Sequence, residues 1–228
     1  MSLAREHRLN VLGLLPVWRR RDAAPVAALD AAVPIGAAQG SGVEAEWAAL
    51  EAEVRTCTRC ALHSLHRNAI LGAGDRQADW LVVSEAPTIE EAAQGEPFVG
   101  QAGQLLDAML AAIGLKRGEK VYITHILKSP PPANHDPTPD EIIACRPYLE
   151  RQIALIQPRI ILVLGRVAAQ TLLGAETPVG RLRGQVHTCQ GVPLVVTYHP
   201  AYLLQNPADK GGAWADLLLA QRQWRSGS

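Results

Sequence analysis

The chain has 228 residues, of which 48% are hydrophobic and 19% charged, so it holds enough apolar material for one packed domain and is not wholly disordered. Its 22 Lys and Arg balance its 22 Asp and Glu. A net charge of zero argues against a protein that coats nucleic acid non-specifically and against one that binds membranes through a polybasic segment. It does not exclude a local basic cleft. No apolar run approaches the roughly 18 residues that cross a bilayer, and the N-terminus lacks the apolar core of a signal peptide. We expect a soluble, cytoplasmic protein without a membrane partner.

The chain opens with a short apolar segment, residues 1–18, in which apolar residues stand beside two arginines and one histidine. Its expected partner-binding anchors are Leu12, Leu14 and Trp18. The segment is too short to form a core and too apolar for an idle tail. Residues 19–43 follow; they are rich in Ala, Pro and Gly, lack helical periodicity and predict a flexible linker. One domain is expected over 44–228.

Beyond the linker, the spacing of apolar residues predicts helices that alternate with short strands. In chain order we expect a helix over 44–56, a strand over 80–83, a helix over 103–113, a strand over 121–127, a helix over 138–156, a strand over 159–164, a helix over 166–173, a strand over 193–197 and a helix over 208–223. The third of these helices starts with a capping box, formed by Thr138 and Glu141. This α/β alternation predicts a parallel sheet that is covered on both faces and binds ligands beyond the carboxyl ends of its strands.

Polar residues follow three of these strands. Glu85 comes soon after the first strand, His125 lies near the end of the second, and His199 follows the fourth. All three are expected at one edge of the sheet. Glu85 can orient or activate a water there, or it caps the helix that follows it. His199 can donate a hydrogen bond to developing negative charge, or it is a structural residue of the His-Pro turn.

Two further features are candidates for a site. Phe98, the only Phe, stands in a Gly- and Pro-rich loop, where it can present its ring to a planar ligand or plug the core. Cys57 and Cys60 stand at CxxC spacing. Together with Cys145 they can bind iron or zinc, or they are small buried thiols.

These pieces together resemble the iron–sulfur, thermophile-type (type IV) family of the uracil-DNA glycosylase superfamily. The matching segments are SEAPTIEEAAQGEPFVGQAGQLLDAML (84–110), YITHILKSPPPANHDPTPDEIIACRPYL (122–149) and TYHPAYLLQNP (197–207). The similarity covers about residues 45–225. It implies a three-layer α/β/α domain with a four-stranded parallel sheet, and the strands counted independently agree with that number.

The resemblance implies a function in DNA repair. This family hydrolyses the N-glycosidic bond of uracil in DNA, after the base is flipped out of the stack. By motif position, Phe98 would stack on the base, His199 would hydrogen-bond the uracil oxygen where charge accumulates, and Glu85 would help to position water. The resemblance also implies a 4Fe-4S cluster. Three of its four ligand positions are occupied by Cys57, Cys60 and Cys145.

This sequence departs from the family pattern at four positions. Ser84 and Thr88 stand where the family has Gly, and Thr88, at the base-binding loop, cannot follow a backbone that only Gly adopts. His125 stands at the position where the family has an Asn that binds the base. A neutral imidazole has its donor and its acceptor on opposite edges, whereas an amide presents both together to N3–H and O4 of uracil. Ser129 occupies the fourth ligand position of the cluster. Cys189 matches no ligand position and is interpreted as structural.

Residues 8–20, RLNVLGLLPVWRR, are similar to the N-terminal peptide of the ψ subunit of the bacterial DNA polymerase III clamp loader. This second resemblance implies that segment 1–18 binds clamp-loader subunits. Two hypotheses follow: a uracil-DNA glycosylase with an altered pocket, or a catalytically weak or inactive ψ-like accessory protein of the replicative polymerase. Cations near the predicted edge either contact DNA phosphates or stay solvated. They are Lys128, Arg166, Arg181 and Arg183.

Overall fold

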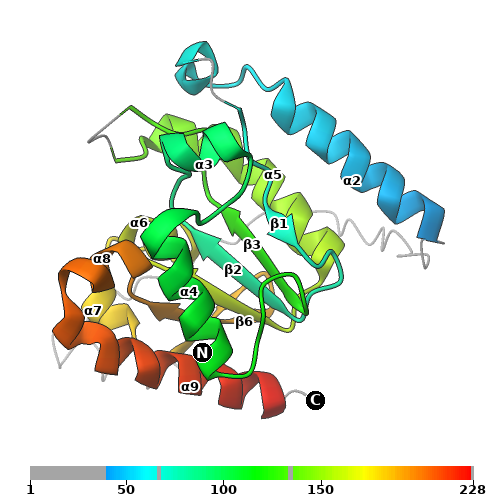
Figure 1. The fold of residues 1–228 in the computed structure, drawn as a ribbon. Helices are drawn as coiled ribbons and strands as arrows, with labels where there is room; N and C mark the ends of the chain where they lie inside the picture. Colours follow the sequence, from blue (N-terminus) through cyan, green and yellow to red (C-terminus); the bar gives the residue numbers. More distant parts are fainter. Residues whose placement is uncertain (1–39, 66–67, 133–135, 227–228) are drawn as a thin grey trace, which may run out of the picture. The chain divides into compact units, whose positions relative to one another are not determined.

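The computed structural model of the chain describes residues 40–65, 68–132 and 136–226. These residues belong to one unit, Gln39–Ser228. The expected partner-binding peptide, 1–18, and most of the expected linker lie outside the described residues, so both stay predictions. Figure 1 shows the described unit as a central sheet with helices on both of its faces.

Within the described residues the sheet has six strands, in the order β1-β3-β2-β4-β6-β5. The four central strands run parallel to one another: β3 (Val121–His125), β2 (Trp80–Ser84), β4 (Ile160–Leu164) and β6 (Val192–Thr197). Every residue of β2, β3 and β4 is buried, which is typical of parallel strands covered on both faces. These are the four strands that the apolar runs predict.

The sheet has one further strand at each edge, and both are antiparallel to their neighbours. β1 (Ala73–Gly74) pairs with β3, and β5 (Val186–Cys189) pairs with β6. Neither has an apolar run, because β1 is two small residues and β5 alternates exposed with half-buried positions. Gln190 and Gly191, with φ of 50° and 80°, form the two-residue hairpin turn between β5 and β6. The expected four-stranded sheet is therefore corrected to six strands with a parallel centre.

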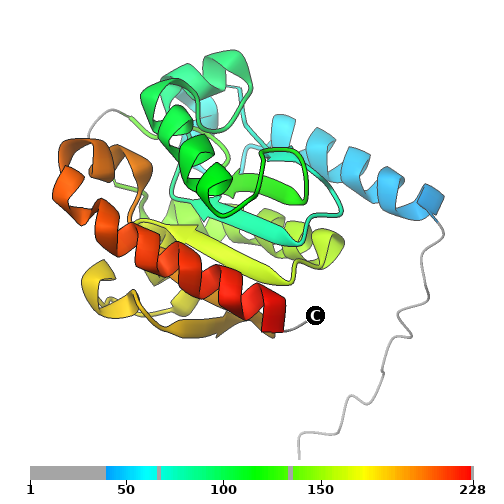
Figure 2. The same cartoon turned by 60° about the horizontal axis from the view of Figure 1, so that its bottom comes forward.

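Helices form the two outer layers (Figures 1 and 2). The helices on one face are α2 (Gly40–Arg55), α5 (Pro139–Ile156) and α6 (Arg166–Leu173). The main helices on the other face are α4 (Gly100–Ala112) and α9 (Lys210–Ser226). Side chains alternate between the two faces of a strand, so the sheet divides the core into two hydrophobic clusters. Leu81 and Val83 of β2 pack in the cluster under α2, α5 and α6, whereas Trp80 and Val82 pack in the cluster under α4 and α9.

Most helix boundaries lie near those expected. The capping box of Thr138 and Glu141 starts α5 as predicted, whereas α2 begins at Gly40 rather than at 44. Short elements that periodicity does not detect complete the domain: α3 (Ile89–Gln94), α7 (Val179–Leu182), α8 (Pro200–Gln205) and 3-10 turns at Ala61–Leu65 and Pro207–Asp209. Among the described residues, no helix has the length and hydropathy needed to cross a bilayer.

Candidate active site

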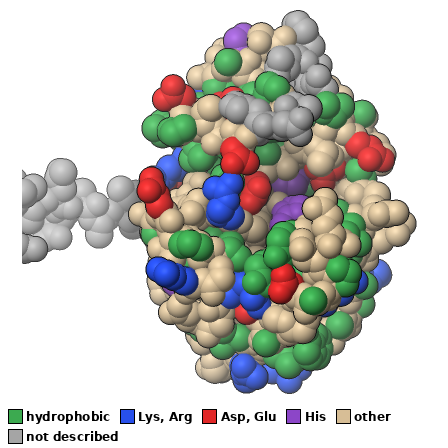
Figure 3. All heavy atoms as spheres, turned by 90° about the vertical axis from the view of Figure 1, so that its left-hand side faces the viewer, with side chains coloured by type: hydrophobic (Ala, Val, Ile, Leu, Met, Phe, Trp, Pro, Cys, Tyr) green, Lys and Arg blue, Asp and Glu red, His purple; other side chains and the backbone are tan. Residues whose placement is uncertain are grey.

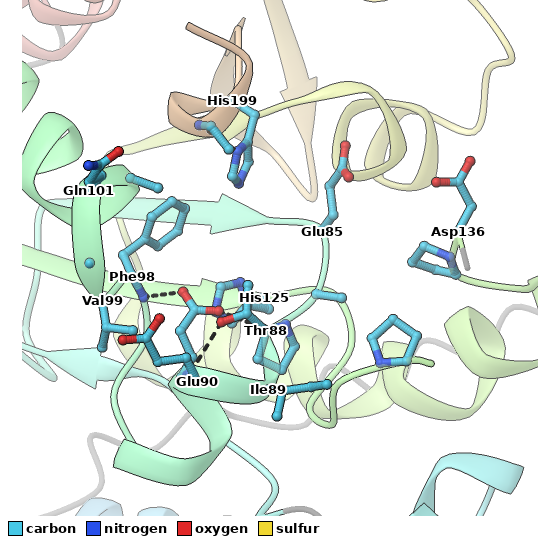
Figure 4. Close-up of a pocket in the computed structure, with 18 of the residues that line it drawn as sticks. Glu85, Thr88, Ile89, Glu90, Phe98, Val99, Gln101, His125, Asp136 and His199 are labelled. Carbon is cyan, nitrogen blue, oxygen red and sulfur yellow. Dashed lines mark hydrogen bonds between the residues drawn. The ribbon is translucent and has the colours of Figure 1, made fainter. Parts of the chain in front are cut away.

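Loops at the carboxyl ends of the central strands line one cavity of about 1010 Å³. β2 and β3 end side by side, with Ser84 paired in register to His125. In Figure 3 this face of the molecule is hollowed, and histidine side chains lie in the hollow. The cavity lining includes all five side chains proposed for catalysis and base binding: Glu85, Thr88, Phe98, His125 and His199. Figure 4 shows these side chains around the cavity.

The Phe98 ring is buried and stacked near two histidine rings (Figure 4). Its centroid lies 5.6 Å from that of His125 and 5.4 Å from that of His199, with interplanar angles of 25° and 27°. Near-parallel rings at these separations attract one another when they are offset. Three flat rings from separate segments therefore form a wall that suits a planar ligand.

The backbone at Phe98 has an unusual conformation that its neighbours hold. Phe98 has φ 58°, in the left-handed region that few residues other than Gly adopt. Its N–H donates to Glu91 Oε1, and its carbonyl accepts from Arg117 Nη2 at 3.2 Å. The carbonyl also lies against α4, where a Cβ added at Gly103 would be 2.0 Å away. The ring is therefore positioned by contacts to its backbone.

His199 follows β6 and is the N-cap of α8. Its Nδ1 accepts the Ala201 N–H at 3.1 Å, so the neutral ring carries its proton on Nε2. Nε2 lies 3.0 Å from Ser84 Oγ, to which it donates. Burial lowers the pKa of His199 to about 4, so the ring is neutral at pH 7. His199 is thus a fixed neutral donor, and Ser84 is the residue that orients it.

His125 is the last residue of β3, and its side chain is almost entirely buried beside the cavity, at 1% exposure. Neither ring nitrogen has a hydrogen-bond partner among the described residues. Burial, followed by the charges of Lys128 and His199, lowers its pKa to about 3, so this ring is also neutral. A buried polar group without a partner costs roughly 1–3 kcal/mol. The ring therefore marks a place where a ligand can supply the missing partners.

Glu85 lies in the loop after β2, and its carboxylate reaches across to α6. Oε1 accepts the Val167 N–H at 2.9 Å, so Glu85 caps α6 rather than α3, the helix that follows it in the chain. Gly165, with φ 94°, permits this approach, because an added Cβ would lie 2.6 Å from Oε1. Burial holds the pKa of Glu85 above its ordinary value, and the Val167 N–H and the nearby Arg166 offset part of this rise. The carboxylate is therefore fixed at the cavity by a backbone donor.

Thr88 is the N-cap of α3, and its hydroxyl already has a structural role. Oγ1 accepts the Glu91 N–H at 3.2 Å, and Glu91 Oε2 accepts the Thr88 N–H, which together form a capping box. Its φ is −80°, so Thr88 does not adopt a conformation reserved for Gly. Thr88 lines the cavity as a helix cap, and its base-binding role stays a prediction.

Lys128 does not reach the surface, which corrects its expected role as a phosphate contact. Its side chain is 2% exposed. Nζ donates to Thr124 Oγ1 at 2.7 Å, to Gln152 Oε1 at 2.6 Å and to the His125 carbonyl at 2.8 Å. Burial lowers the pKa of Lys128 to about 7. The Lys128 amine is therefore buried in a hydrogen-bond network next to the end of β3 that carries His125.

The three arginines that the sequence predicts near this edge of the sheet differ in their exposure to solvent. Arg183 is largely buried and pairs with Asp216 at 2.6 Å, so it also fails the expectation of a phosphate contact. Arg166 is 52% exposed and pairs with Asp136 at 2.7 Å at the cavity rim. Arg181 is exposed on α7. Arg166 and Arg181 therefore keep the role predicted for them as a proposal.

The cysteines do not form the ligand set that a four-iron cluster needs. Cys57 and Cys60 follow α2, Cys145 lies on α5, and Ser129 has a hydroxyl where the cluster needs a thiolate. Among the described residues, no three His, Cys, Asp or Glu side chains form a group that could hold a metal ion. The residues present therefore do not fit the implied cluster, and no step below uses one. Cys189 is a free thiol in β5.

Two residues that hold the Phe98 backbone, Glu91 and Arg117, are not among the predicted site residues. Glu91 stands three residues after Thr88, the same T-x-x-E spacing that predicts the start of α5, so the capping-box pattern was a usable signal. Arg117 acts from 19 residues away along the chain, through the Phe98 carbonyl. No local pattern indicates such a contact.

Known proteins resemble this chain along most of its described length. The family model described as the Uracil DNA glycosylase superfamily matches residues 71–219. A Type-4 uracil-DNA glycosylase of Archaeoglobus fulgidus is 45% identical over 163 residues, which cover 68% of this chain and 81% of the relative. The Type-4 uracil-DNA glycosylase of Pyrobaculum aerophilum is 38% identical, with coverages of 73% and 88%. That of Saccharolobus solfataricus is 43% identical, with coverages of 68% and 76%.

Proposed function

Since the chain belongs to the uracil DNA glycosylase superfamily, we propose that it is a uracil-DNA glycosylase of DNA repair. It hydrolyses the N-glycosidic bond of a flipped-out uracil, or a related damaged base, in DNA. The observation that carries this proposal is the convergence of the Phe98 ring, the His199 N–H donor and the Glu85 carboxylate on one cavity. These groups hold a planar base, stabilise the leaving base and orient the attacking water.

The base enters the cavity and lies against the Phe98 ring. Extruding a base from the DNA stack costs a few kcal/mol. Stacking on an aromatic side chain returns roughly 1–3 kcal/mol of that cost. Because Glu91 and Arg117 hold the Phe98 backbone, the ring is in place before the base arrives. This preorganisation keeps the ordering cost low at the moment of binding.

His199 stabilises the leaving base. As the bond from sugar C1′ to the base breaks, its electron pair moves onto the base and the sugar becomes oxocarbenium-like. In the free protein Ser84 Oγ accepts the Nε2–H of His199. When the base is bound, its oxygen takes up this N–H as the negative charge develops. Loss of one such donor typically lowers kcat by roughly a hundredfold or more.

Glu85 orients the water that completes the hydrolysis. Its carboxylate is held at the start of α6 by the Val167 N–H and cannot swing away without losing that bond. The water oxygen bonds to C1′ on the sugar and its proton is released, so the products are an abasic sugar and, after protonation, the free base. A negative carboxylate beside the site also favours the positive sugar of the transition state.

His125 determines how the edge of the base is read. The unpartnered neutral ring has one donor and one acceptor on opposite edges, so a single nitrogen meets the base. An amide at this position would meet both N3–H and O4 of uracil. We infer that the base makes fewer hydrogen bonds here than with an Asn, and that discrimination between related bases is correspondingly weaker.

The test is excision of uracil from single- and double-stranded DNA, measured as abasic sites. We expect His199→Ala to lower kcat by about a hundredfold. His187 is the matched control: it lies on β5, bonds the Leu182 carbonyl at 2.8 Å and does not line the cavity, so His187→Ala keeps wild-type activity. If folded protein at enzyme–substrate equivalence forms no abasic product, the proposal is wrong.

A second proposal concerns partners and place, and it does not exclude the first. The resemblance of residues 8–20 to the ψ peptide supports binding of segment 1–18 to clamp-loader subunits, in the cytoplasm where replicating DNA lies. A pull-down with purified clamp-loader subunits tests it. Trp18→Ala and deletion of residues 1–18 are each expected to abolish association while excision continues. Unchanged association in both variants contradicts the proposal.

A further inference from the structure

A second cavity, of about 790 Å³, adjoins the first, and the part of its lining beyond Glu85 and His199 has no role in the chemistry proposed above. Glu85, Asp136, His199 and Ala201 belong to the linings of both cavities. The two spaces therefore meet at the groups that face the bond to be cleaved. Beyond this junction, the second cavity lies between the starts of α6 and α7 and one side of α8.

A stack of one cation and two aromatic rings borders this second cavity. The Arg183 guanidinium lies 3.9 Å from the centroid of the Tyr198 ring. The Tyr198 ring is in turn stacked with that of Tyr202, at 4.9 Å between centroids and 28° between planes. Asp216 holds Arg183, and Asp209 accepts the hydrogen bond of the Tyr202 hydroxyl at 2.7 Å. Both ends of the stack are thus fixed.

Tyr202 is the outer ring of the stack and lines the cavity at 41% exposure. A fixed, exposed aromatic ring loses little conformational freedom when another ring packs on it. The stack can therefore be extended by one more flat group. The fixed Tyr202 ring offers an aromatic surface on which a nucleobase can stack by its π face.

The charges around the second cavity favour stacking over phosphate binding as the source of affinity. Among the described residues of the lining, Arg166 is the cation, and Asp136 already pairs with it at 2.7 Å. Glu85 adds a further carboxylate to the same lining. A ligand held mainly by several phosphates would meet this negative charge at close range. A base that packs on Tyr202 leaves room for one phosphate to contact Arg166.

We propose that the second cavity binds the nucleotide next to the flipped one, in an unpaired state, with its base stacked on Tyr202. This inference rests on the proposed function, because it takes DNA as the substrate. Neighbouring nucleotides are joined through one phosphate, so the neighbour of a base in the first cavity lies where the two cavities meet. Stacking is tolerant of sequence, since every base has a π face. The site therefore favours single-stranded or locally melted DNA.

The test uses short single strands with 2-aminopurine on the 5′ or the 3′ side of 2′-fluoro-deoxyuridine. The electron-withdrawing fluorine slows loss of the base, so binding is measured without cleavage. We expect wild-type protein to quench the 2-aminopurine of one of the two strands. Tyr202→Ala is expected to remove this quenching and weaken binding about tenfold. Tyr202→Phe keeps the ring and loses only the bond to Asp209, so it is expected to keep most of the quenching and to bind far more tightly than Tyr202→Ala.

Because the signal reports binding, the two proposals fail separately. Quenching that depends on Tyr202, with no abasic product from cleavable strands, overturns the glycosylase proposal and supports the subsite. Uracil excision together with equal binding and fluorescence of wild type and Tyr202→Ala, in both strands, overturns the subsite alone. Absence of binding to either strand overturns both. Thermal melting of Tyr202→Ala checks that the variant is folded, as expected for a substitution at an exposed side chain.

Discussion

Replacing Glu91 by Gln tests whether the Phe98 ring is held in place through its backbone. Glu91 is buried, and each of its carboxylate oxygens accepts one backbone N–H, from Thr88 and from Phe98. An amide has only one acceptor oxygen. In the variant, one of the two N–H groups therefore faces an NH₂ group and is left without an acceptor.

The magnitude follows from these two bonds. A buried N–H without an acceptor costs roughly 1–3 kcal/mol, and the remaining bond loses roughly 1 kcal/mol of charge assistance, so Glu91→Gln is expected to lose about 3 kcal/mol. Glu141 is the matched control, since it is also buried in a capping box but accepts only the Thr138 N–H, at 2.8 Å. Its amide can turn the oxygen to that donor, so Glu141→Gln is expected to lose about 1 kcal/mol.

Urea unfolding at neutral pH measures the free energy of unfolding of both variants, and kcat/KM for uracil excision is measured on the same preparations. We expect the Glu91 variant to lose about 2 kcal/mol more than the control. Its kcat/KM is expected to fall about tenfold, because the stacking ring is no longer preorganised. Equal losses of free energy with full activity in both variants would refute the reasoning and leave Glu91 as a helix cap only.

Four further changes test other parts of the site. His125→Asn offers uracil one more hydrogen bond, so kcat/KM on uracil-containing strands is expected to rise about fivefold, and an unchanged value contradicts the edge-reading role. Below pH 6.5 the unfolded chain protonates His125 and His199, while the folded pKa values are about 3 and about 4. Stability therefore falls as pH drops from 6.5 towards 4, and urea midpoints are expected to show a shallower fall for His125→Asn. Gly165→Ala places a Cβ 2.6 Å from Oε1 of Glu85 and is expected to abolish excision, whereas Gly174→Ala, with open space around it, loses only about 1 kcal/mol of stability from its positive φ and keeps activity. Cys57→Ala is expected to leave the Tm unchanged, and iron analysis is expected to find less than a full cluster; stoichiometric iron that is lost with that variant would show that these residues do hold a cluster.

The positions of the central strands and the edge that carries the polar residues follow from local patterns. Four short, mainly apolar segments predict buried parallel strands, and the strands β2, β3, β4 and β6 confirm them. Because parallel strands end at a common edge, residues placed just after them meet there. Glu85, His125 and His199 all line the same cavity for this reason. The family resemblance rests on the same segments and is confirmed by the match over residues 71–219.

The edge strands and the state of the site residues depend on contacts that no local pattern contains. β5 forms because a two-residue turn returns the chain along β6, so its alternating sequence carries no core signal. Lys128 reads as a surface cation, yet the fold buries it against Gln152, 24 residues further along the chain.

From its own pattern, the sequence determined the layered α/β domain, its parallel centre, its family and the set of residues gathered at one edge. Only the folded chain decided which atom of His199 holds a proton, because its partners, Ser84 and the Ala201 N–H, include a residue 115 positions away. The same holds for the unpartnered ring of His125 and for the second cavity beside the first. Burial depth and hydrogen-bond partners arise from packing between distant segments, and these quantities set charge, tautomer and cavity shape.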